Sequence, residues 1–233
     1  MITFLFSQIF RRLETKLLTF GPTGMLLCLL SLASLAHGSL QVAVVDTRGQ
    51  PLAGTVVFLN ALGPTATPGN MPESATMDQV KRQFSPHILV VSKGTSVAFP
   101  NSDSIKHHVY SFSDAKTFEL KLYKDRSGSP ILFDVPGEVE LACNIHDWML
   151  GYIFVVEGEH YARTDDAGEV AFQPPDGRYR LGIWHPRLQE VDKDFFREIK
   201  LVSDVPQEIV IQLSRSLLPA YDPTAAAPVE DYE

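Results

Sequence analysis

Short runs rich in Val, Ile, Phe and Tyr recur from residue 40 onwards, separated by clusters of Gly, Pro, Asn and Asp. This pattern is typical of an all-β protein, and no helix of convincing length is expected after the N-terminal stretch. Segment 77–84 (MDQVKRQF) is ambiguous between a helical turn and an irregular approach to a strand. Seven strands are expected in the middle of the chain, enough for a β-sandwich, at 87–92, 96–100, 107–113, 118–123, 131–135, 139–143 and 152–158.

The two ends of the mature chain are also rich in strand signals. Two strands are expected near the N-terminus and five near the C-terminus, at 40–46, 54–60, 161–165, 168–173, 178–184, 196–202 and 208–213. An isolated hairpin is marginal in water, so the two groups are expected to pair with each other. We therefore predict a discontinuous β-sandwich domain (39–62 plus 159–213) into which a second β-sandwich domain (76–158) is inserted. Residues 63–75 form the predicted linker, and 214–233 a disordered acidic tail.

The first 38 residues differ from the rest. Arg11, Arg12 and Lys16 precede an apolar run over 25–35, and small residues follow it. This order of basic, apolar and small residues predicts a secretory signal peptide over 1–38 and hence an exported, periplasmic protein. The apolar run is short for a bilayer span, which needs ~20 residues. An uncleaved membrane anchor is the alternative, and the choice between the Sec and Tat routes stays open.

Composition and charge narrow the possible partners. The 233-residue chain is 45% hydrophobic and 21% charged, as in an ordinary globular protein. Removal of 1–38 takes away three basic residues and one acidic residue, which moves the formal net charge from −8 to −10. An acidic mature protein is a poor candidate for binding nucleic acid or an anionic membrane, and its charge would suit a basic protein partner.

Export makes the cysteine count informative. One of the two cysteines, Cys28, lies in the predicted signal peptide, so Cys143 remains alone in the mature chain. Oxidising compartments favour disulfides, but a lone cysteine cannot form one internally. Cys143 is therefore a free thiol, an intermolecular bridge or a metal ligand, and a buried inert cysteine is the plain alternative.

The segment CNIHDWM (143–149) carries three donors at every third position: Cys143, His146 and Met149. A thiolate, an imidazole and a thioether on one loop favour copper over zinc, because thioether sulfur suits a soft, redox-active metal. A trigonal copper site needs one more imidazole, which His107 or His108 at the start of a predicted strand can supply. Neighbouring residues of a strand point to opposite faces, so only one of the two can readily bind.

Other residues carry weaker signals. Asp103 and Ser104 are expected to shape the loop before the histidines, and Trp184-His185-Pro186 at a strand end is expected to be packing. The sequence contains no nucleophile–base set, no phosphate-binding loop and no zinc-finger spacing. We therefore predict that the protein is not an enzyme.

The copper motifs carry a family resemblance. FPNSDSIKHHV followed by VELACNIHDWMLGYIFVVEG resembles the cupredoxin family, the plastocyanin-like blue (type 1) copper proteins, over about residues 84–158, and its loop length resembles amicyanin. Amicyanins carry an Asn six residues before the first copper His, and Asn101 precedes His107 by six. The resemblance thus implies a cupredoxin Greek-key β-sandwich with one type 1 copper bound by His107, Cys143, His146 and a weak axial Met149.

The same resemblance implies a role in electron transport. It implies an electron port at the exposed edge of His146, framed by Trp148 and Leu150, and a redox partner such as a c-type cytochrome or a periplasmic dehydrogenase. The whole chain also resembles exported bacterial proteins labelled methylamine utilization proteins, and this resemblance implies amine oxidation as a candidate pathway.

Three positions depart from the cupredoxin pattern. Ile145 and Asp147 stand where prolines flank the second copper His in relatives, and His108 replaces an Asn that usually ties the two ligand loops together. These departures leave room for a more labile site, so copper storage, sensing or delivery is the alternative function. A β-sandwich adhesion or binding module with an inert cysteine is a third.

The terminal segments carry a second resemblance. VVDTRGQPLAGTVVFL and RTDDAGEVAFQPPDGRYRLGIWHP resemble transthyretin-like, carboxypeptidase-regulatory-like sandwiches. That family is a structural or binding module, so the resemblance implies no catalysis and is consistent with the insertion predicted above.

Overall fold

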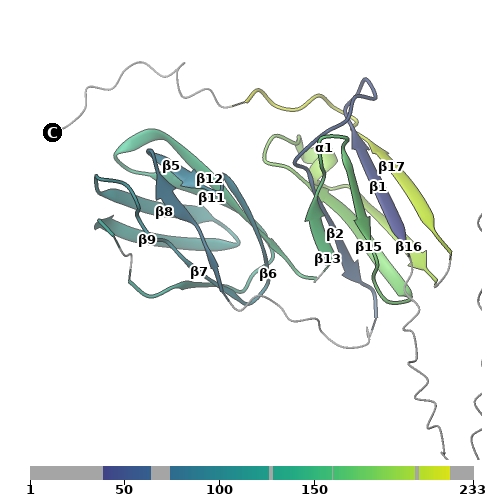
Figure 1. Ribbon diagram of the computed structural model, residues 1–233, viewed down its shortest axis with the longest axis horizontal. Helices are drawn as coiled ribbons and strands as arrows, with labels where there is room; N and C mark the ends of the chain where they lie inside the picture. Colours follow the sequence, from purple (N-terminus) through teal and green to yellow (C-terminus); the bar gives the residue numbers. More distant parts are fainter. Residues whose placement is uncertain (1–38, 64–73, 126–127, 159, 203–204, 221–233) are drawn as a thin grey trace, which may run out of the picture. The chain divides into compact units, whose positions relative to one another are not determined.

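The computed structural model describes residues 39–63, 74–125, 128–158, 160–202 and 205–220, and these residues form a nearly all-β protein (Figure 1). The predicted signal peptide and most of the predicted linker and tail lie outside the described residues. In chain order the first strands are β1 (Leu40–Val45), β2 (Val56–Ala61), β3 (Ser74–Thr76), β4 (Asp78–Val80), β5 (Gln83–Ser85), β6 (Ile88–Ser92), β7 (Thr95–Ala98), β8 (His107–Ser113) and β9 (Lys116–Tyr123).

The remaining elements complete the all-β pattern. They are β10 (Ile131–Phe133), β11 (Gly137–Cys143), β12 (His146–Val156), β13 (His160–Arg163), β14 (Glu169–Phe172), β15 (Gly177–Trp184), α1 (Glu190–Lys193), β16 (Phe196–Leu201) and β17 (Gln207–Gln212). The all-β fold class is thereby confirmed, with one four-residue helix in the described part of the chain.

The middle of the chain builds a five-stranded sheet with the order β6-β12-β11-β8-β9 (Figure 1). Strand β12 pairs antiparallel with β11 and parallel with β6, so the chain must cross over between β6 and β12. A three-stranded sheet, β10-β7-β3, contributes to the same hydrophobic core. This core holds Phe99, Val109, Phe133, Leu141 and Ile153, all at most 1% exposed.

The two ends of the chain pair with each other in two further sheets. Strand β1 lies between β14 and β17, and β2 lies between β13 and β15, with β16 at the edge of that sheet. Residues of both sheets share a second core that includes Leu40, Leu59, Leu181 and Leu201. The exact domain boundaries stay a prediction.

Side chains along β8 alternate between the buried core and the outer face of the sheet. His107, Val109 and Ser111 are buried, whereas the intervening side chains of β8 face outward to different extents. Successive side chains of a strand point to opposite faces, so a histidine at the first position of β8 faces the core.

The ambiguous segment 77–84 is neither a helical turn nor an irregular approach. Strands β4 and β5 form a tight antiparallel hairpin, in which Val80 pairs with Gln83 and only Lys81 and Arg82 lie in the turn. Strand β3 begins at Ser74, inside the predicted linker, because it pairs in parallel with β7.

The first residues of the predicted tail are also held by hydrogen bonds. The amides of Ser214 and Arg215 donate to the carboxylate of Asp192, at 2.8 and 3.1 Å, and Leu218 N donates to Arg187 O at 2.8 Å. These bonds give the start of the tail a defined path. Among the described residues, no helix has the length and apolar character needed to cross a membrane.

Candidate metal centre

Three strand ends position the candidate donors. His107 is the first residue of β8, Cys143 the last residue of β11 and His146 the first residue of β12. Only two residues, Asn144 and Ile145, separate Cys143 from His146, and these two donors pair across the hairpin. The two-residue spacing of Cys-x-x-His therefore places a thiol and an imidazole side by side.

Strand β12 begins earlier than expected. The sequence predicted a strand from residue 152, but β12 runs from His146. A register shift after Ala142 pairs Ala142 with Leu150 and Cys143 with His146, so Asp147, Trp148 and Met149 are extra residues on β12. A second shift lies between His107 and Val109 on the β8–β9 ladder. Bulges of this kind bend a strand and re-aim side chains, and they are common beside functional sites.

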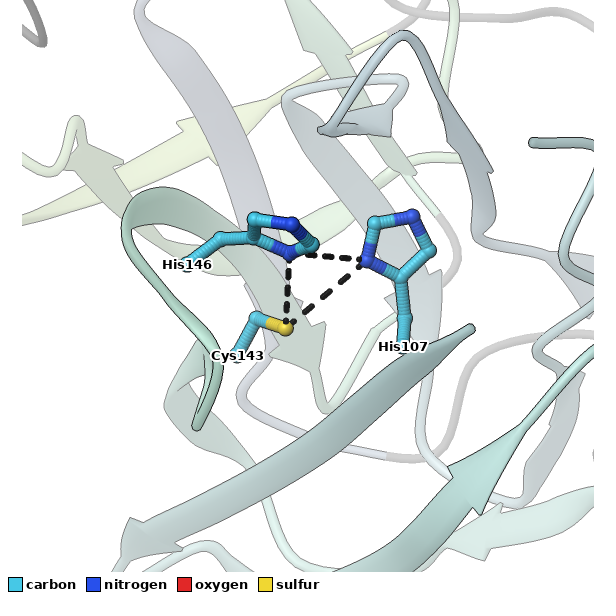
Figure 2. A group of neighbouring side chains, drawn as sticks. All are labelled: His107, Cys143 and His146. Carbon is cyan, nitrogen blue, oxygen red and sulfur yellow. Dashed lines mark hydrogen bonds between the residues drawn. The ribbon is translucent and has the colours of Figure 1, made fainter. Parts of the chain in front are cut away.

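The three donors converge on one buried point (Figure 2). The Nδ1 atoms of His107 and His146 lie 3.2 Å apart, and Cys143 Sγ lies 3.8 Å from His107 Nδ1 and 3.5 Å from His146 Nδ1. The exposed fractions of the three residues are 0%, 2% and 7% for His107, Cys143 and His146. Within the described ranges this is the group of three or more His, Cys, Asp or Glu donors that could hold a metal.

The spacing fits a single bound ion. Ligands at about 2.0 Å (nitrogen) and 2.3 Å (sulfur) from a common centre stand roughly 3.3–3.7 Å apart at trigonal or tetrahedral angles. The observed separations of 3.2, 3.5 and 3.8 Å fall close to this range. A thiolate with two imidazoles and a weak thioether is the donor set of blue-copper sites.

His107, and not His108, faces the other donors. The ring of His108 points to the opposite side of β8, where its Nε2 lies 2.9 Å from Glu119 Oε1. Asn101 holds the preceding loop, since its Nδ2 donates to the carbonyls of Ile105 at 2.9 Å and Tyr123 at 3.1 Å. A backbone hydrogen bond joins the two ligand segments, from Asn144 N to His108 O at 3.2 Å.

Met149 is 1% exposed and belongs to the same core cluster as Cys143. Its predicted role as an axial ligand stays a prediction. Trp148 packs against His146 with ring centroids 5.3 Å apart. His146 is 7% exposed and the adjacent Ile145 is 48% exposed. The electron port at the exposed edge of His146 stays a prediction.

The electrostatics of the cluster lower the pKa of Cys143 and raise that of His107. Burial alone would raise the pKa of Cys143, but hydrogen bonding to His107 and to the backbone of His108 and Ile145 outweighs it and lowers that pKa. Burial alone would lower the pKa of His107, but its contacts with Cys143 and Asp103 raise it instead. A thiolate is the form of cysteine that binds metals.

Sequence reasoning understated Asp103. It was expected only to shape the loop, but its Oδ2 lies 2.8 Å from His107 Nε2, the ring nitrogen that faces away from Cys143. The four-residue spacing of Asp103 and His107 did not predict this contact. In a helix such residues lie side by side, but a loop has no regular geometry that fixes their distance. The hairpin turn at 81–82, which holds Asp103, was missed because segment 77–84 was ambiguous.

No family model matches the chain, and no curated protein matches it. Among solved structures the chain is similar to a copper-containing nitrite reductase from Thermus scotoductus SA-01, at 25% identity and a TM-score of 0.35, over 50% of this chain and 28% of that chain. It is also similar to the oxidized state of a proline-to-alanine mutant of amicyanin, at 22% identity and a TM-score of 0.33, over 36% of this chain and 83% of that chain.

A third similar structure is a purple cupredoxin from Nitrosopumilus maritimus, at 22% identity and a TM-score of 0.31, over 36% of this chain and 98% of that chain. Because these TM-scores lie below 0.5, the assignment of the metal centre rests on its own geometry and chemistry.

Proposed function

We propose that this chain binds one copper ion through His107, Cys143 and His146, with Met149 as a weak axial ligand, and that it carries single electrons. The observation that supports this most strongly is the convergence of one buried thiol and two buried imidazole Nδ1 atoms, 3.2–3.8 Å apart. The resemblance of the ligand segments to cupredoxins points to the same metal.

The donor set favours copper over other metals. Zinc sites commonly complete a tetrahedron with further Cys, His or carboxylate ligands, whereas a thioether suits copper. Asp103 faces the far side of the His107 ring, so it does not supply a fourth donor to the point where the three donors converge. Met149 is the buried residue of the ligand segment that remains for that position.

The protein frame suits a carrier. Bound copper would supply a one-electron couple at this site. The strands hold His107, Cys143 and His146 in fixed positions, and core residues such as Val109 and Leu141, both fully buried, exclude water. A frame that stays the same in both oxidation states lowers the cost of rearrangement at each transfer, which distinguishes a carrier from an enzyme that must admit a substrate.

The setting and partner extend the proposal. The predicted signal peptide over 1–38 and the acidic mature charge favour a periplasmic carrier that meets a basic patch on its partner. A c-type cytochrome or a periplasmic dehydrogenase is the class of partner that the cupredoxin resemblance implies, with amine oxidation as one candidate pathway.

Absorption and EPR spectra of the copper-loaded mature protein test the proposal. An intense band in the red from Cys143–copper charge transfer is expected, and Cys143→Ser should abolish it. His108→Gln is the matched control and should keep the band, because His108 bonds to Glu119 on the other face of β8. A colourless Cu(II) protein with an intact Cys143 would overturn the carrier function.

Repeated cycles of reduction and oxidation separate a carrier from a protein that stores or delivers copper. The proposed carrier retains its copper through the cycles in the presence of a Cu(I) chelator. Rapid loss of Cu(I) to the chelator would contradict electron transfer as its function.

A further inference from the structure

The carboxylate of Asp103 collects three hydrogen bonds beside the metal centre. Its Oδ1 accepts from the backbone amide of Lys81 at 2.5 Å, and its Oδ2 accepts from the amide of Arg82 at 2.8 Å and contacts Nε2 of His107 at 2.8 Å. The side chain of Asp103 is 13% exposed, whereas that of His107 is fully buried. This one carboxylate thus joins the β4–β5 hairpin to a proposed metal ligand.

The hairpin turn is shaped to hold an anion. Lys81 and Arg82 both have left-handed backbones, with φ of 54° and 59°. Two successive residues of this kind form the tight turn that best matches the twist of a two-residue hairpin, but Asn and Gly are the usual residues there. Non-glycine residues in this region are strained and persist where the surrounding structure holds them. Successive amides of such turns form concave sites for anions, and here the anion is Asp103.

The contact with Asp103 decides which nitrogen of His107 is available to a metal. A carboxylate accepts hydrogen bonds, so the single proton of the neutral ring lies on Nε2, between the ring and Asp103. Nδ1 then keeps its lone pair, and this is the atom that lies 3.2 Å from His146 Nδ1 and 3.8 Å from Cys143 Sγ (Figure 2). A carboxylate behind a histidine ligand also makes the imidazole a stronger electron donor.

We propose that Asp103, held by the amides of the Lys81–Arg82 turn, is a positioning residue that fixes the Nε2–H tautomer of His107 and strengthens its bond to Cu(II) more than to Cu(I). This inference rests on the proposed copper function for its redox consequence. Its structural part, the tautomer, is a property of the metal-free protein. The hairpin β4–β5 is therefore part of the device that sets the balance between the two oxidation states.

A purely structural role for Asp103 makes a different prediction, and Asp78 provides the comparison. Asp78 lies on the same hairpin and also holds the ligand loop, since its carboxylate accepts from Ser102 N at 3.1 Å and Ser102 Oγ at 2.7 Å. Asp78→Asn removes the same charge as Asp103→Asn and loosens the same loop. The structure records no contact between Asp78 and His107.

The test measures two properties of Asp103→Asn and Asp78→Asn. In metal-free protein, ¹⁵N NMR of the histidine rings reports the tautomer of His107. In copper-loaded protein, competition titrations with Cu(II) and Cu(I) chelators report the two affinities. We expect Asp103→Asn to lose the fixed Nε2–H tautomer and to bind Cu(II) roughly 10–100-fold more weakly, the usual loss when such a partner is removed, with a smaller loss for Cu(I). Asp78→Asn should leave the tautomer and the ratio of the two affinities unchanged.

Two further variants support the interpretation. Asp103→Ser removes the carboxylate without adding an amide donor, so it should show the same losses if Asp103→Asn does not fold. Lys81→Gly with Arg82→Gly keeps both backbone amides and relaxes the left-handed turn, so it should behave like the wild type.

The NMR comparison is made at a pH at which the His107 ring is neutral, and the proposal is overturned if that ring lacks a fixed Nε2–H tautomer in the metal-free wild type. It is overturned equally if Asp103→Asn matches Asp78→Asn in both tautomer and affinity ratio. If the wild type binds no copper at all, the proposed function fails, and the tautomer in metal-free protein then decides alone whether Asp103 positions His107.

Discussion

Two histidines at strand ends, His107 and His185, have pKa values that are shifted in opposite directions. His107 opens β8 and His185 follows the last residue of β15. Asp103 and Cys143 raise the pKa of His107 against the effect of its burial. Burial, Arg187, Arg163 and His87 together lower the pKa of His185 to about 4. Burial alone therefore does not make a histidine functional. The neighbouring charges determine the role of each ring. Anionic neighbours favour a ring that can bind a metal, and cationic neighbours keep a ring neutral, with a structural role.

Replacement of each histidine by alanine gives the largest expected difference. His107→Ala removes a proposed ligand and should weaken copper binding by more than the roughly 10–100-fold typical of losing a partner of a ligand. His185→Ala should leave copper binding at the wild-type level, because its Nδ1 accepts a hydrogen bond from Arg187 N at 3.1 Å. Isothermal titration with a competing chelator measures both. Equal losses of copper affinity in the two variants would contradict the different roles of His107 and His185.

The pH dependence of stability should separate the same two residues. His185 has a pKa of about 4 in the folded protein and about 6.5 in the unfolded chain, so protonation favours unfolding. The stabilisation is present above pH 6.5 and is lost as the pH falls towards 4, a difference of roughly 2–3 kcal/mol. Urea unfolding of metal-free protein at pH 7.5 and 4.5 measures it. His185→Gln should lose less stability over this interval than the wild type.

His107→Gln is the control of opposite sign. The pKa of His107 is raised, so its contribution is present below the unfolded pKa and is lost as the pH rises through the folded pKa. This variant should therefore lose more stability than the wild type on acidification. Parallel pH profiles for both variants and the wild type would refute the opposite roles of the two rings.

Met149→Leu tests whether Met149 is part of the copper site. The substitution conserves volume in the core, so the free energy of unfolding should change by less than ~1.5 kcal/mol. The absorption maximum and the reduction potential of the copper protein should nevertheless shift, because the proposed axial thioether is gone. An unchanged absorption spectrum and reduction potential would show that Met149 only packs in the core.

The smallest effect is expected at His108, the neighbour of the ligand. Its contact with Glu119 is partly exposed, with 17% and 55% of the two side chains accessible. Because such pairs contribute ~0.2–1 kcal/mol, His108→Gln should change stability by no more than this. Copper titration should give the wild-type affinity. A large loss of affinity would show that the ring of His108 also serves the metal.

Much of the fold follows from sequence pattern. The runs of Val, Ile, Phe and Tyr predicted strand β8 with its exact bounds, His107–Ser113, and β15 to within one residue. Strong period-two patterning bounded by turn residues makes such strands recognisable. The hairpin at 78–85 was not recognised, because its strands are three residues long and its turn uses Lys81 and Arg82 instead of Asn or Gly.

The candidate site was predictable to a similar degree. The spacing of Cys143 and His146 placed both on one hairpin, and alternation along β8 left one of two histidines facing them. The contact between Asp103 and His107 was not predictable, because it depends on where the 81–82 turn lies relative to a loop 22 residues later along the chain. The bulge at Asp147–Met149 was also missed, since register shifts depend on pairing between strands and leave no local pattern.

X-ray absorption at the copper edge tests the central claim, that one ion is bound by both histidines and Cys143. The copper-loaded protein is predicted to show two nitrogen ligands near 2.0 Å and one sulfur near 2.2–2.3 Å, with the sulfur lost in Cys143→Ser. Reduced and oxidized samples should give nearly the same shell, as expected for a site held by strand ends. A shell of nitrogen and oxygen alone, in protein with an intact Cys143, would contradict the account.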